Sequence, residues 1–509
     1  MKNFQSLALW KKPSVILGLI LAAFFLKGVF LATLFPLFAG QDETKHFNSV
    51  ELLSEPRPII WPINNNVKKN TDGMQKGNYT EEILETGKAV NFDEEIKGEL
   101  YNTPSFEKGF FGKNEITINE NNWKKYNEDY PVSYAGNSLY HRIASAVKKL
   151  LGQQNILTDY FLIRIFSVLL GTLAVLFSYF IVKNIGFSAK HSLILAAIIA
   201  FQPRFSIYSA AINYDLLLIL MFTLFTLGGV LALKYGLNWK NFLLMIASIY
   251  LGIQTKPTAN ILLVAAVLLF AYFAYEKIKN KNKNVRYAAY SLIIFAAIFF
   301  SLYLKNRFIG NAGSLGNIAT SVKNYLSESL TMGRFGLSSR TYWGSLGWTN
   351  NWLLDKATNI IWAIEAFSAI GIALLLIPKK YLLVILNLVR NLYRKLTSYV
   401  KMPNYQPLAS TEKLDFLPEK KYIIFLLGMI AALQLGIRTA DWLTYGETGA
   451  PGRYFMPNLV AHIVLVFTGL GMLLRKKEYF EKSLIVGLIL MMTFMLYIIF
   501  DVIILRYYL

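Results

Sequence analysis

The sequence predicts an all-α integral membrane protein. Its 509 residues are 54% hydrophobic and 15% aromatic, with a mean hydropathy of +0.39, which is more apolar than a soluble chain of this length. Apolar stretches long enough to cross a bilayer recur along the chain, and basic residues are concentrated on alternate connecting segments. These observations predict a bundle of about 11 transmembrane helices with a large extracytoplasmic first loop.

Hydropathy and length define the expected spans. They cover residues 14–38, 160–182, 192–208, 216–233, 242–253, 259–275, 287–304, 356–377, 422–437, 456–474 and 483–505. The segment 242–253 is short for a span. The first stretch is too long for a removable signal peptide and lacks a small-residue cleavage site, so we expect it to remain as a helix.

Basic residues predict the orientation of the chain in the membrane. With the N-terminus inside, the inside segments carry 25 Lys and Arg residues against 6 Asp and Glu residues. The loop 39–158 carries 14 basic and 17 acidic residues. Because basic residues favour the cytoplasmic side, this loop is expected outside. The formal net charge of +21 then reflects topology and contact with anionic membrane lipids rather than nucleic-acid binding.

The spans and loops divide the chain into parts. These are a first transmembrane helix (1–38), an extracytoplasmic loop with an acidic motif and an amphipathic helix (39–158), transmembrane helices 2–7 (159–304), an extracytoplasmic loop (305–354), transmembrane helix 8 (355–377), a basic cytoplasmic segment (378–421) and transmembrane helices 9–11 (422–509). The amphipathic helix, residues 138–151, is expected to lie on the membrane surface and to lead into the second span.

An acidic motif follows the first apolar stretch, where a helix leaves the bilayer. Asp42 and Glu43 are adjacent, and His46 shares a face with Asp42 if the segment is helical. A carboxylate at this boundary can accept a proton from an acceptor hydroxyl, and with the histidine the pair can hold a metal such as Mg or Mn. The alternative is a solvated loop that ends a helix, since charged residues are common at span ends.

Asn213 and Asp215 are candidate binding residues at the outer end of the fourth span. Asp215 opens a helix, where the dipole favours a carboxylate. That capping role is one interpretation. The other makes the two side chains a second polar wall that faces Asp42.

Cations gather at the same outer helix ends. Arg453 lies between Gly452 and Tyr454 at the start of the tenth span, and arginine suits bidentate contact with phosphate. Lys256 lies between the fifth and sixth spans. The alternative is that such residues anchor helix ends at the interface. Several cations that face an acidic pair on one side of the membrane would suit a phosphate donor and a hydroxyl acceptor.

Aromatic residues and buried charges complete the candidates. Trp343 and Trp348 lie in a segment with glycines and can stack on a sugar ring, although an aromatic belt is the commoner use. Lys27 and Glu365 lie deep in apolar segments, where charges are costly. Lys27 is too far along its helix from Asp42 to share a centre with it, so we expect a structural or cavity-lining role.

Five short motifs in order along the chain resemble the GT-C superfamily of polytopic glycosyltransferases, which use polyprenyl-phosphate sugars. The likeness is greatest to a D-E-x-x-H-F branch of membrane proteins without a settled reaction. The motifs lie at residues 41–47 (D-E-x-x-H-F), 203–215 (Pro, Ser, Asn and Asp in order), 256–258 (K-P-T), 342–348 (aromatic residue, then W-G-x-x-G-W) and 452–457 (G-R-Y-x-x-P).

The resemblance implies a GT-C-like bundle with an external active site under the first loop. Asp42 would be the catalytic or acceptor-activating carboxylate, Arg453 would contact the donor phosphate, and the anomeric carbon would be inverted. Two departures affect this expectation. Gln41 replaces the usual proline, and the H-P-P-L-Y-Y stretch before the second span is altered at residues 136–141, which implies a different acceptor subsite or impaired activity.

We therefore expect a cell-membrane glycosyltransferase that moves a sugar from a polyprenyl-phosphate donor to a glycan, lipid or protein acceptor on the extracytoplasmic side. Glu43 and His46 would support Asp42 or hold a metal, while Lys256 and Arg453 would neutralise the departing phosphate. One alternative is a flippase or transporter of lipid-linked saccharides, although the sequence shows no broken helices or paired repeats. Another is a non-catalytic subunit of an envelope glycan assembly complex.

Overall fold

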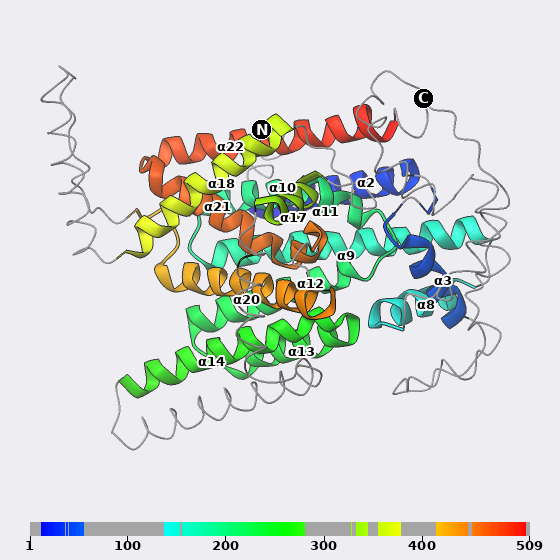
Figure 1. Cartoon of the computed structure of the whole chain (residues 1–509), viewed down its shortest axis with the longest axis horizontal. Coiled ribbons are helices and arrows are strands. Elements are labelled where there is room, and N and C mark those ends of the chain that lie inside the picture. The colour runs from blue at the N-terminus through cyan, green and yellow to red at the C-terminus, as the bar shows by residue number, and fades with distance from the viewer. Residues whose placement is uncertain are drawn as a thin grey trace, which may run out of the picture.

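The computed structural model describes residues 12–35, 37–38, 40–54, 137–152, 155–279, 327, 332–344, 355–377, 414–445 and 450–504, and the secondary structure there is helical (Figure 1). The long helices run roughly side by side, and α3 and α8 lie together at one end of the bundle.

In chain order the elements are α2 (Pro13–Leu34), α3 (Glu43–Ser54), α8 (Leu139–Leu151), α9 (Ile156–Asn184), α10 (Ala189–Ala200), α11 (Pro203–Ser209), α12 (Asp215–Tyr235), α13 (Trp239–Thr255), η2 (Pro257–Asn260), α14 (Ile261–Lys279), α17 (Met332–Gly344), α18 (Asp355–Leu376), α20 (Lys420–Tyr445), η4 (Gly452–Asn458), α21 (Leu459–Leu474), α22 (Lys477–Tyr497) and η5 (Ile498–Ile504).

The helices confirm the prediction of an all-α integral membrane protein. Within the described ranges, 8 helices are long and apolar enough to cross a membrane, or up to 9 if one bent pair counts as a span. The short predicted span 242–253 lies within α13, which has 17 residues. The predicted span 287–304 lies outside the described residues.

The third predicted span is broken, which corrects the expectation that the chain has no broken helix. α10 and α11 meet at an angle of 65°. Pro203 begins α11, and a proline ends a preceding helix because it lacks an N–H and restricts the residue before it. The Lys27 ammonium of α2 donates to the carbonyl of Ala200 and to Ser206 Oγ, at 2.7 Å from the latter. The buried amine of Lys27 therefore stabilises the free end of α10.

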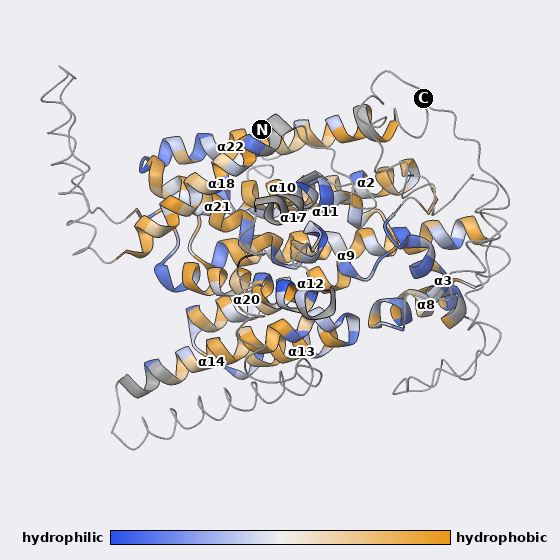
Figure 2. Ribbon diagram, in the orientation of Figure 1, coloured by the Kyte–Doolittle hydropathy of each residue, from blue (hydrophilic) through white to orange (hydrophobic). Residues whose placement is uncertain are grey.

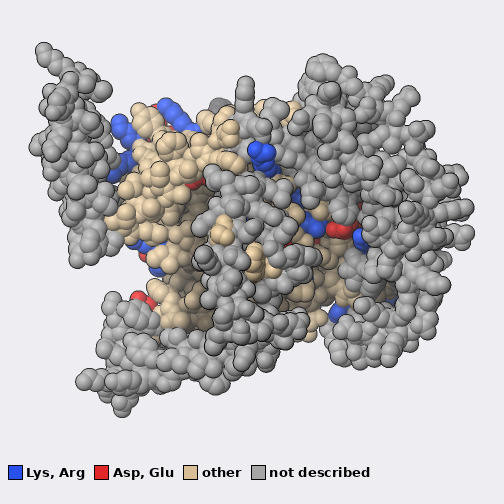
Figure 3. All heavy atoms as spheres, viewed as in Figure 1, with Lys and Arg blue, Asp and Glu red and all other residues tan. Residues whose placement is uncertain are grey.

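Hydrophobic residues predominate along most of the bundle helices, whereas hydrophilic residues are frequent at the end that holds α3 and α8 (Figure 2). On the face shown in Figure 3 the described atoms are mainly uncharged, with Lys and Arg atoms at the left margin and acidic and basic atoms side by side towards the right. Large apolar side chains such as Leu26, Ile424 and Phe500 are exposed, as expected for helices that face lipid.

The segment 138–151 is helical as α8, and its position on the membrane surface stays a prediction. Ser138 accepts a hydrogen bond from the backbone of the first turn, which is a favourable N-cap. Lys148 contacts Glu51 of α3 and lies 3.1 Å from Asp159 of α9. These ion pairs join α8 to the helix that follows the acidic motif and to the second span. Residues 55–136 of the predicted first loop lie outside the described residues.

The short helix α17 is held against η4 by a close backbone approach. A Cβ on Gly452 would lie 2.1 Å from the backbone nitrogen of Tyr342, so only glycine fits there. The Gly452 N–H donates to Thr341 Oγ1 at 2.7 Å. From the other side, Gln202 Nε2 donates to the carbonyl of Tyr342 at 3.1 Å. α17 is thereby fixed between η4 and the break that precedes α11.

Candidate active site

Asp42 lies at the start of α3, on the turn that connects it to α2. Its φ of 56° falls in the left-handed region, which aspartate tolerates better than most residues. Its carbonyl accepts the N–H of His46 at 3.0 Å, so the backbone of Asp42 already belongs to the helix start. Its carboxylate Oδ2 lies 3.0 Å from Nη1 of Arg453 in η4. Two predicted site residues that are 411 positions apart in the sequence are in direct contact.

A second ion pair lies beside the first. Lys256 Nζ is 2.7 Å from Asp215 Oδ1, and its ammonium lies over the rings of Tyr214 and Tyr454, at 4.6 and 4.7 Å from their centroids. The ring of Tyr454 also lies 5.0 Å from the Arg453 guanidinium. Both cations therefore contact the same aromatic ring.

We call the group Asp42, Asp215, Lys256, Arg453 and Tyr454 the ionic cluster. Burial alone would raise the pKa of the Asp42 carboxyl, but the charge of Arg453 and its hydrogen bond lower it overall. Burial alone would lower the pKa of Lys256, but Asp215 and Tyr214 raise it overall. Asp42 is therefore a carboxylate and Lys256 an ammonium at neutral pH.

Glu43 has a different environment from its neighbour. Its two carboxylate oxygens each lie 2.9 Å from a nitrogen of Arg164 in α9. They also accept the backbone N–H groups of Ile212 and Gly40, at 2.9 Å each. Burial alone would raise the pKa of Glu43, but Arg164 lowers it overall. We call this bidentate pair the Glu43–Arg164 clamp.

The clamp ties three segments together. Besides Glu43, Arg164 donates to the carbonyls of Ala32 and Phe35 at the end of α2. Ile212, which donates to Glu43, belongs to the connection before α12. The turn that carries Asp42 is therefore fixed by this clamp, and the polar contacts of Glu43 are made outside the ionic cluster.

His46 lies next to the ionic cluster in a buried aromatic group. Its Nδ1 is 2.9 Å from Nε2 of His141, and its ring meets that of Tyr214 edge-on at 4.6 Å. The backbone N–H of Ser138 donates to Nδ1 of His141 at 3.2 Å. Because that nitrogen accepts, the proton of His141 is on Nε2 and is donated to His46 Nδ1, which leaves the proton of His46 on its own Nε2.

Both histidines are neutral. Burial lowers the pKa of His46 to about 4, although Asp42 and Asp215 act in the opposite direction. Burial also holds the pKa of His141 well below its usual range. His46 can therefore donate a hydrogen bond from Nε2 at neutral pH, but it carries no positive charge there.

The remaining predicted residues lie in other settings. Asn213 donates to the carbonyl of Tyr208 at 3.0 Å and accepts the N–H of Leu216 at 3.2 Å, so its side chain is used within the backbone connection that leads into α12. Trp343 donates from Nε1 to Glu365 at 3.0 Å, in a separate cavity. Trp348 lies outside the described residues.

The described residues do not form a metal-ligand set. Among them, no group of three or more His, Cys, Asp or Glu side chains is close enough to hold an ion. Of the three predicted ligands, Glu43 uses both of its oxygens on Arg164, and His46 faces His141. The donors therefore do not fit Mg or Mn, and we derive no step through a metal.

Sequence reasoning missed Arg164 and His141. Arg164 lies inside the apolar stretch 160–182, and a charge within a span is the signal that pointed to Lys27 and Glu365. His141 lies in the altered stretch 136–141 and gave no signal of its own, because its partner is 95 residues away.

A family model described as dolichyl-phosphate-mannose-protein mannosyltransferase matches residues 146–303. Over this range the chain is similar to membrane glycosyltransferases of the GT-C type, which confirms the predicted resemblance to that superfamily. The range holds Asp215 and Lys256 but neither Asp42 nor Arg453. The likeness to the D-E-x-x-H-F branch stays a prediction. No curated protein and no solved structure matches the chain.

Proposed function

We propose that this chain transfers a sugar from a polyprenyl-phosphate donor to an acceptor on the extracytoplasmic side of the membrane. The supporting observation is the contact between the Asp42 carboxylate and Arg453, next to the pair formed by Lys256 and Asp215. A general base beside phosphate-binding cations is the arrangement that such a transfer needs. The family similarity over residues 146–303 supports the class of donor.

The proposed reaction is a single displacement. The acceptor oxygen or nitrogen loses its proton to Asp42 and forms a bond to the anomeric carbon, while the bond from that carbon to the phosphate oxygen breaks. The electron pair of the broken bond leaves with the polyprenyl phosphate, and Arg453 and Lys256 stabilise its growing negative charge. Attack from the side opposite the phosphate inverts the configuration of the sugar.

Because of the two ion pairs, donor binding would also change the basicity of Asp42. While Arg453 contacts Asp42, it lowers the pKa of that carboxyl and weakens it as a base. A donor phosphate would compete with both carboxylates for Arg453 and Lys256. In this proposal Asp42 becomes an effective base when the donor is bound, which limits loss of the sugar to water.

Neighbouring residues position the reacting groups. The Glu43–Arg164 clamp fixes the turn that carries Asp42. His46, neutral and with its proton on Nε2, provides a hydrogen-bond donor beside the ionic cluster. The acceptor approaches from the side of α3 and α8, which carries the altered stretch 136–141.

The test is transfer of a labelled sugar by the purified full chain in lipid nanodiscs. Polyprenyl-phosphate mannose serves as the donor and envelope glycolipid as the acceptor, and release of polyprenyl phosphate is measured. Asp42→Asn should lower the rate about 10²–10⁴-fold, because it keeps the shape but removes the base. Asp415→Asn is the matched control, since that carboxylate is exposed and outside the ionic cluster. Equal transfer by wild type and Asp42→Asn would remove Asp42 from the mechanism.

The proposed side of the membrane has its own test. The chain has no cysteine, so single cysteines at Asn70 and Ser410 can report the sides of the predicted loop 39–158 and segment 378–421. Both positions lie outside the described residues. An impermeant thiol reagent should label the Asn70 site and not the Ser410 site in intact cells. The reverse pattern would place Asp42 on the cytoplasmic side and contradict the proposal.

The broken span favours one second candidate. Discontinuous helices are frequent in transporters, and α10 and α11 form such a break. However, the Lys27 amine at the break already donates to Ala200 and Ser206, which is a structural use of that charge. Movement of a fluorescent lipid-linked saccharide across liposomes, without any consumption of donor, would favour the flippase over the transferase.

A further inference from the structure

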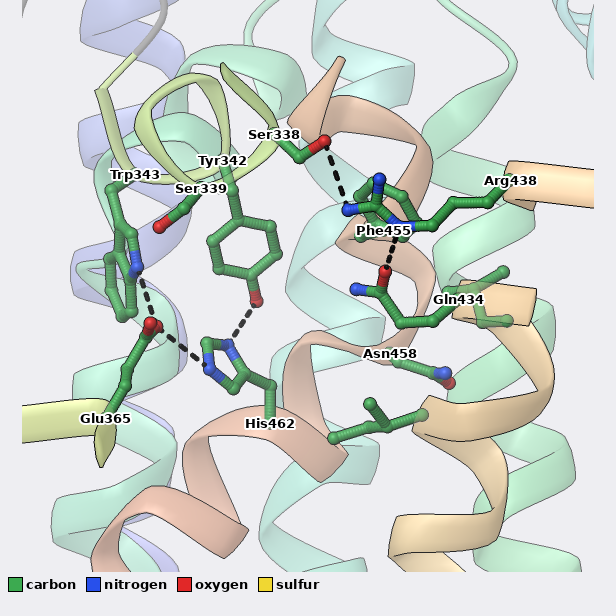
Figure 4. A pocket seen from close by; sticks show the side chains of 12 residues that line it. Ser338, Ser339, Tyr342, Trp343, Glu365, Gln434, Arg438, Phe455, Asn458 and His462 are labelled. Atoms are coloured by element: carbon green, nitrogen blue, oxygen red, sulfur yellow. Dashed lines mark hydrogen bonds and ion pairs between the residues drawn. The ribbon is translucent and has the colours of Figure 1, made fainter. Parts of the chain in front are cut away.

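A cavity of about 110 Å³ lies among α17, α18, α20, α21 and η4, apart from the ionic cluster, and its surface is mainly apolar (Figure 4). One buried water needs only about 10–15 Å³, so the space is large enough for several waters or for one small ring. Polar side chains point into it from both sides, although the surrounding helices are strongly apolar. We call it the α17 pocket.

One wall of the α17 pocket is a hydrogen-bonded row. Glu365 Oε1 accepts Nε1 of Trp343 at 3.0 Å and lies 3.2 Å from Nε2 of His462. The other ring nitrogen of His462 is 3.0 Å from the hydroxyl of Tyr342. The row fixes the orientations of two aromatic rings from α17, so this wall presents rigid apolar faces with polar edges.

The opposite wall carries a guanidinium and two amides. Arg438 Nε donates to Gln434 Oε1 at 3.2 Å. Asn458 donates from Nδ2 to the carbonyl of Met429 at 2.6 Å, but its buried Oδ1 has no partner among the described residues. An unsatisfied buried carbonyl oxygen is costly, so Asn458 is held at this wall at the expense of a hydrogen bond.

We propose that the α17 pocket binds one neutral hydroxylated ring, namely a single sugar unit. The charges of Glu365 and Arg438 balance, so the pocket does not favour an anion. The rings of Trp343 and Phe455 supply the apolar faces on which a sugar ring can pack, and the polar groups of Glu365, Gln434 and Arg438 lie in the same lining for its hydroxyls.

The sugar ring in the α17 pocket would belong to either the donor or the acceptor. This assignment rests on the proposed transferase function. η4 carries Arg453 of the ionic cluster as well as Phe455 and Asn458 of the α17 pocket. A molecule that reaches from one site to the other would pass along this short helix. The sugar chemistry of the pocket itself does not depend on Asp42.

The experiment is binding of free sugars to the full chain in nanodiscs, followed by ligand-observed NMR. The probes are D-mannose, D-glucose and glucose 6-phosphate. The two neutral sugars should bind, and the phosphate ester should bind more weakly because the pocket is electrically balanced. Asn458→Leu and Gln434→Met, which keep the approximate volume, should each weaken binding about threefold to tenfold. Asn184→Leu, at the end of α9, is the matched control and should bind as the wild type does.

Competition identifies the source of the ring. Polyprenyl-phosphate mannose, but not polyprenyl phosphate alone, should displace free mannose if the pocket takes the sugar of the donor. Displacement by the acceptor glycolipid alone would assign the pocket to the acceptor. If no neutral sugar binds, or if both variants bind like the wild type, the pocket holds only water and the inference is wrong. Asp42→Asn should still bind free sugar. The binding measurement therefore tests the α17 pocket even if the transfer assay fails.

Discussion

Asp42 and Glu43 are neighbours in the sequence, and each pairs with an arginine, but their surroundings differ. The side chains of Glu43 and Arg164 are 0% and 1% exposed, whereas those of Asp42 and Arg453 are 24% and 16% exposed. Both oxygens of Glu43 are engaged by the guanidinium and by backbone N–H groups. The Asp42 pair has a single contact of 3.0 Å and access to solvent.

The difference separates a structural ion pair from an exchangeable one. A buried pair with satisfied hydrogen bonds has no remaining capacity for a ligand, and removal of one partner leaves an uncompensated charge. A partly exposed pair costs less to separate, so an incoming phosphate can replace the carboxylate. Adjacent residues of one motif thus have different roles because Glu43 pairs with Arg164 of α9 and Asp42 pairs with Arg453 of η4.

The largest expected effect is on stability at the clamp. Arg164→Ala should lower the free energy of unfolding by about 3–5 kcal/mol, because Glu43 would stay buried without its partner. Arg453→Ala should lower it by only about 1 kcal/mol, since that pair is partly exposed. Unfolding of both variants in detergent, against the wild type, measures the comparison. Similar losses would show that the two pairs do not differ as we propose.

The effect on transfer should follow the opposite order. Arg453→Ala should reduce kcat/KM by about 10²–10³-fold, as expected when a group that stabilises developing charge is lost. Arg453→Lys should retain more activity, because it keeps the charge but not the bidentate geometry. Arg475→Ala, at the other end of α21, serves as the control. Wild-type transfer by Arg453→Ala would leave the arginine with an anchoring role only.

An intermediate effect is expected at the contact between η4 and α17. Gly452→Ala would place a Cβ 2.1 Å from a backbone nitrogen, so the two elements must separate. We expect a loss of about 1–3 kcal/mol in unfolding free energy, typical of an overpacked site, together with weaker transfer. Gly428→Ala is the control because nothing lies within 4 Å of its added methyl group. Unchanged transfer by Gly452→Ala would show that the position of η4 is not critical.

The smallest expected effect is a pH dependence of stability from the buried histidines. The pKa of His46 is about 4 in the folded chain, and an unfolded histidine titrates near about 6.5. Between these values the unfolded chain binds more protons, so the free energy of unfolding should fall as pH is lowered from about 6.5 towards 4. His46→Gln and His141→Gln should each flatten this slope in unfolding measurements from pH 7 to 5. A slope that is unchanged in both variants would contradict the neutral histidine pair.

The sequence predicted much of the fold because hydropathy and length determine which segments can span a membrane. α2, α9 and α12 begin and end close to the predicted bounds. The break between α10 and α11 was missed because the segment 192–208 was treated as one apolar span, although Gln202, Pro203 and Arg204 interrupt it. Pro203 was therefore a local signal of the break, while the contacts of Lys27 at the end of α10 appear only in three dimensions.

For the candidate site, the sequence supplied residue types but not their pairing. Asp42, Lys256 and Arg453 were selected because a carboxylate and cations on one side of the membrane suit a hydroxyl acceptor and a phosphate donor. The separation of Glu43 from Asp42 was not predictable, because it depends on Arg164 from another helix. The α17 pocket was not predicted either, since Gln434, Asn458 and His462 carry no local pattern.

The short helix η4 has three residues per turn, so side chains three positions apart are stacked above one another on the same side. Phe455 and Asn458 share one such column, which faces the α17 pocket, and Arg453 belongs to a different column. The position of each of the seven residues around the axis of η4 therefore determines which site its side chain reaches. An inserted residue would turn the helix by about 120° and exchange the columns, although every side chain would remain present. Length, and not only composition, is therefore constrained in this segment.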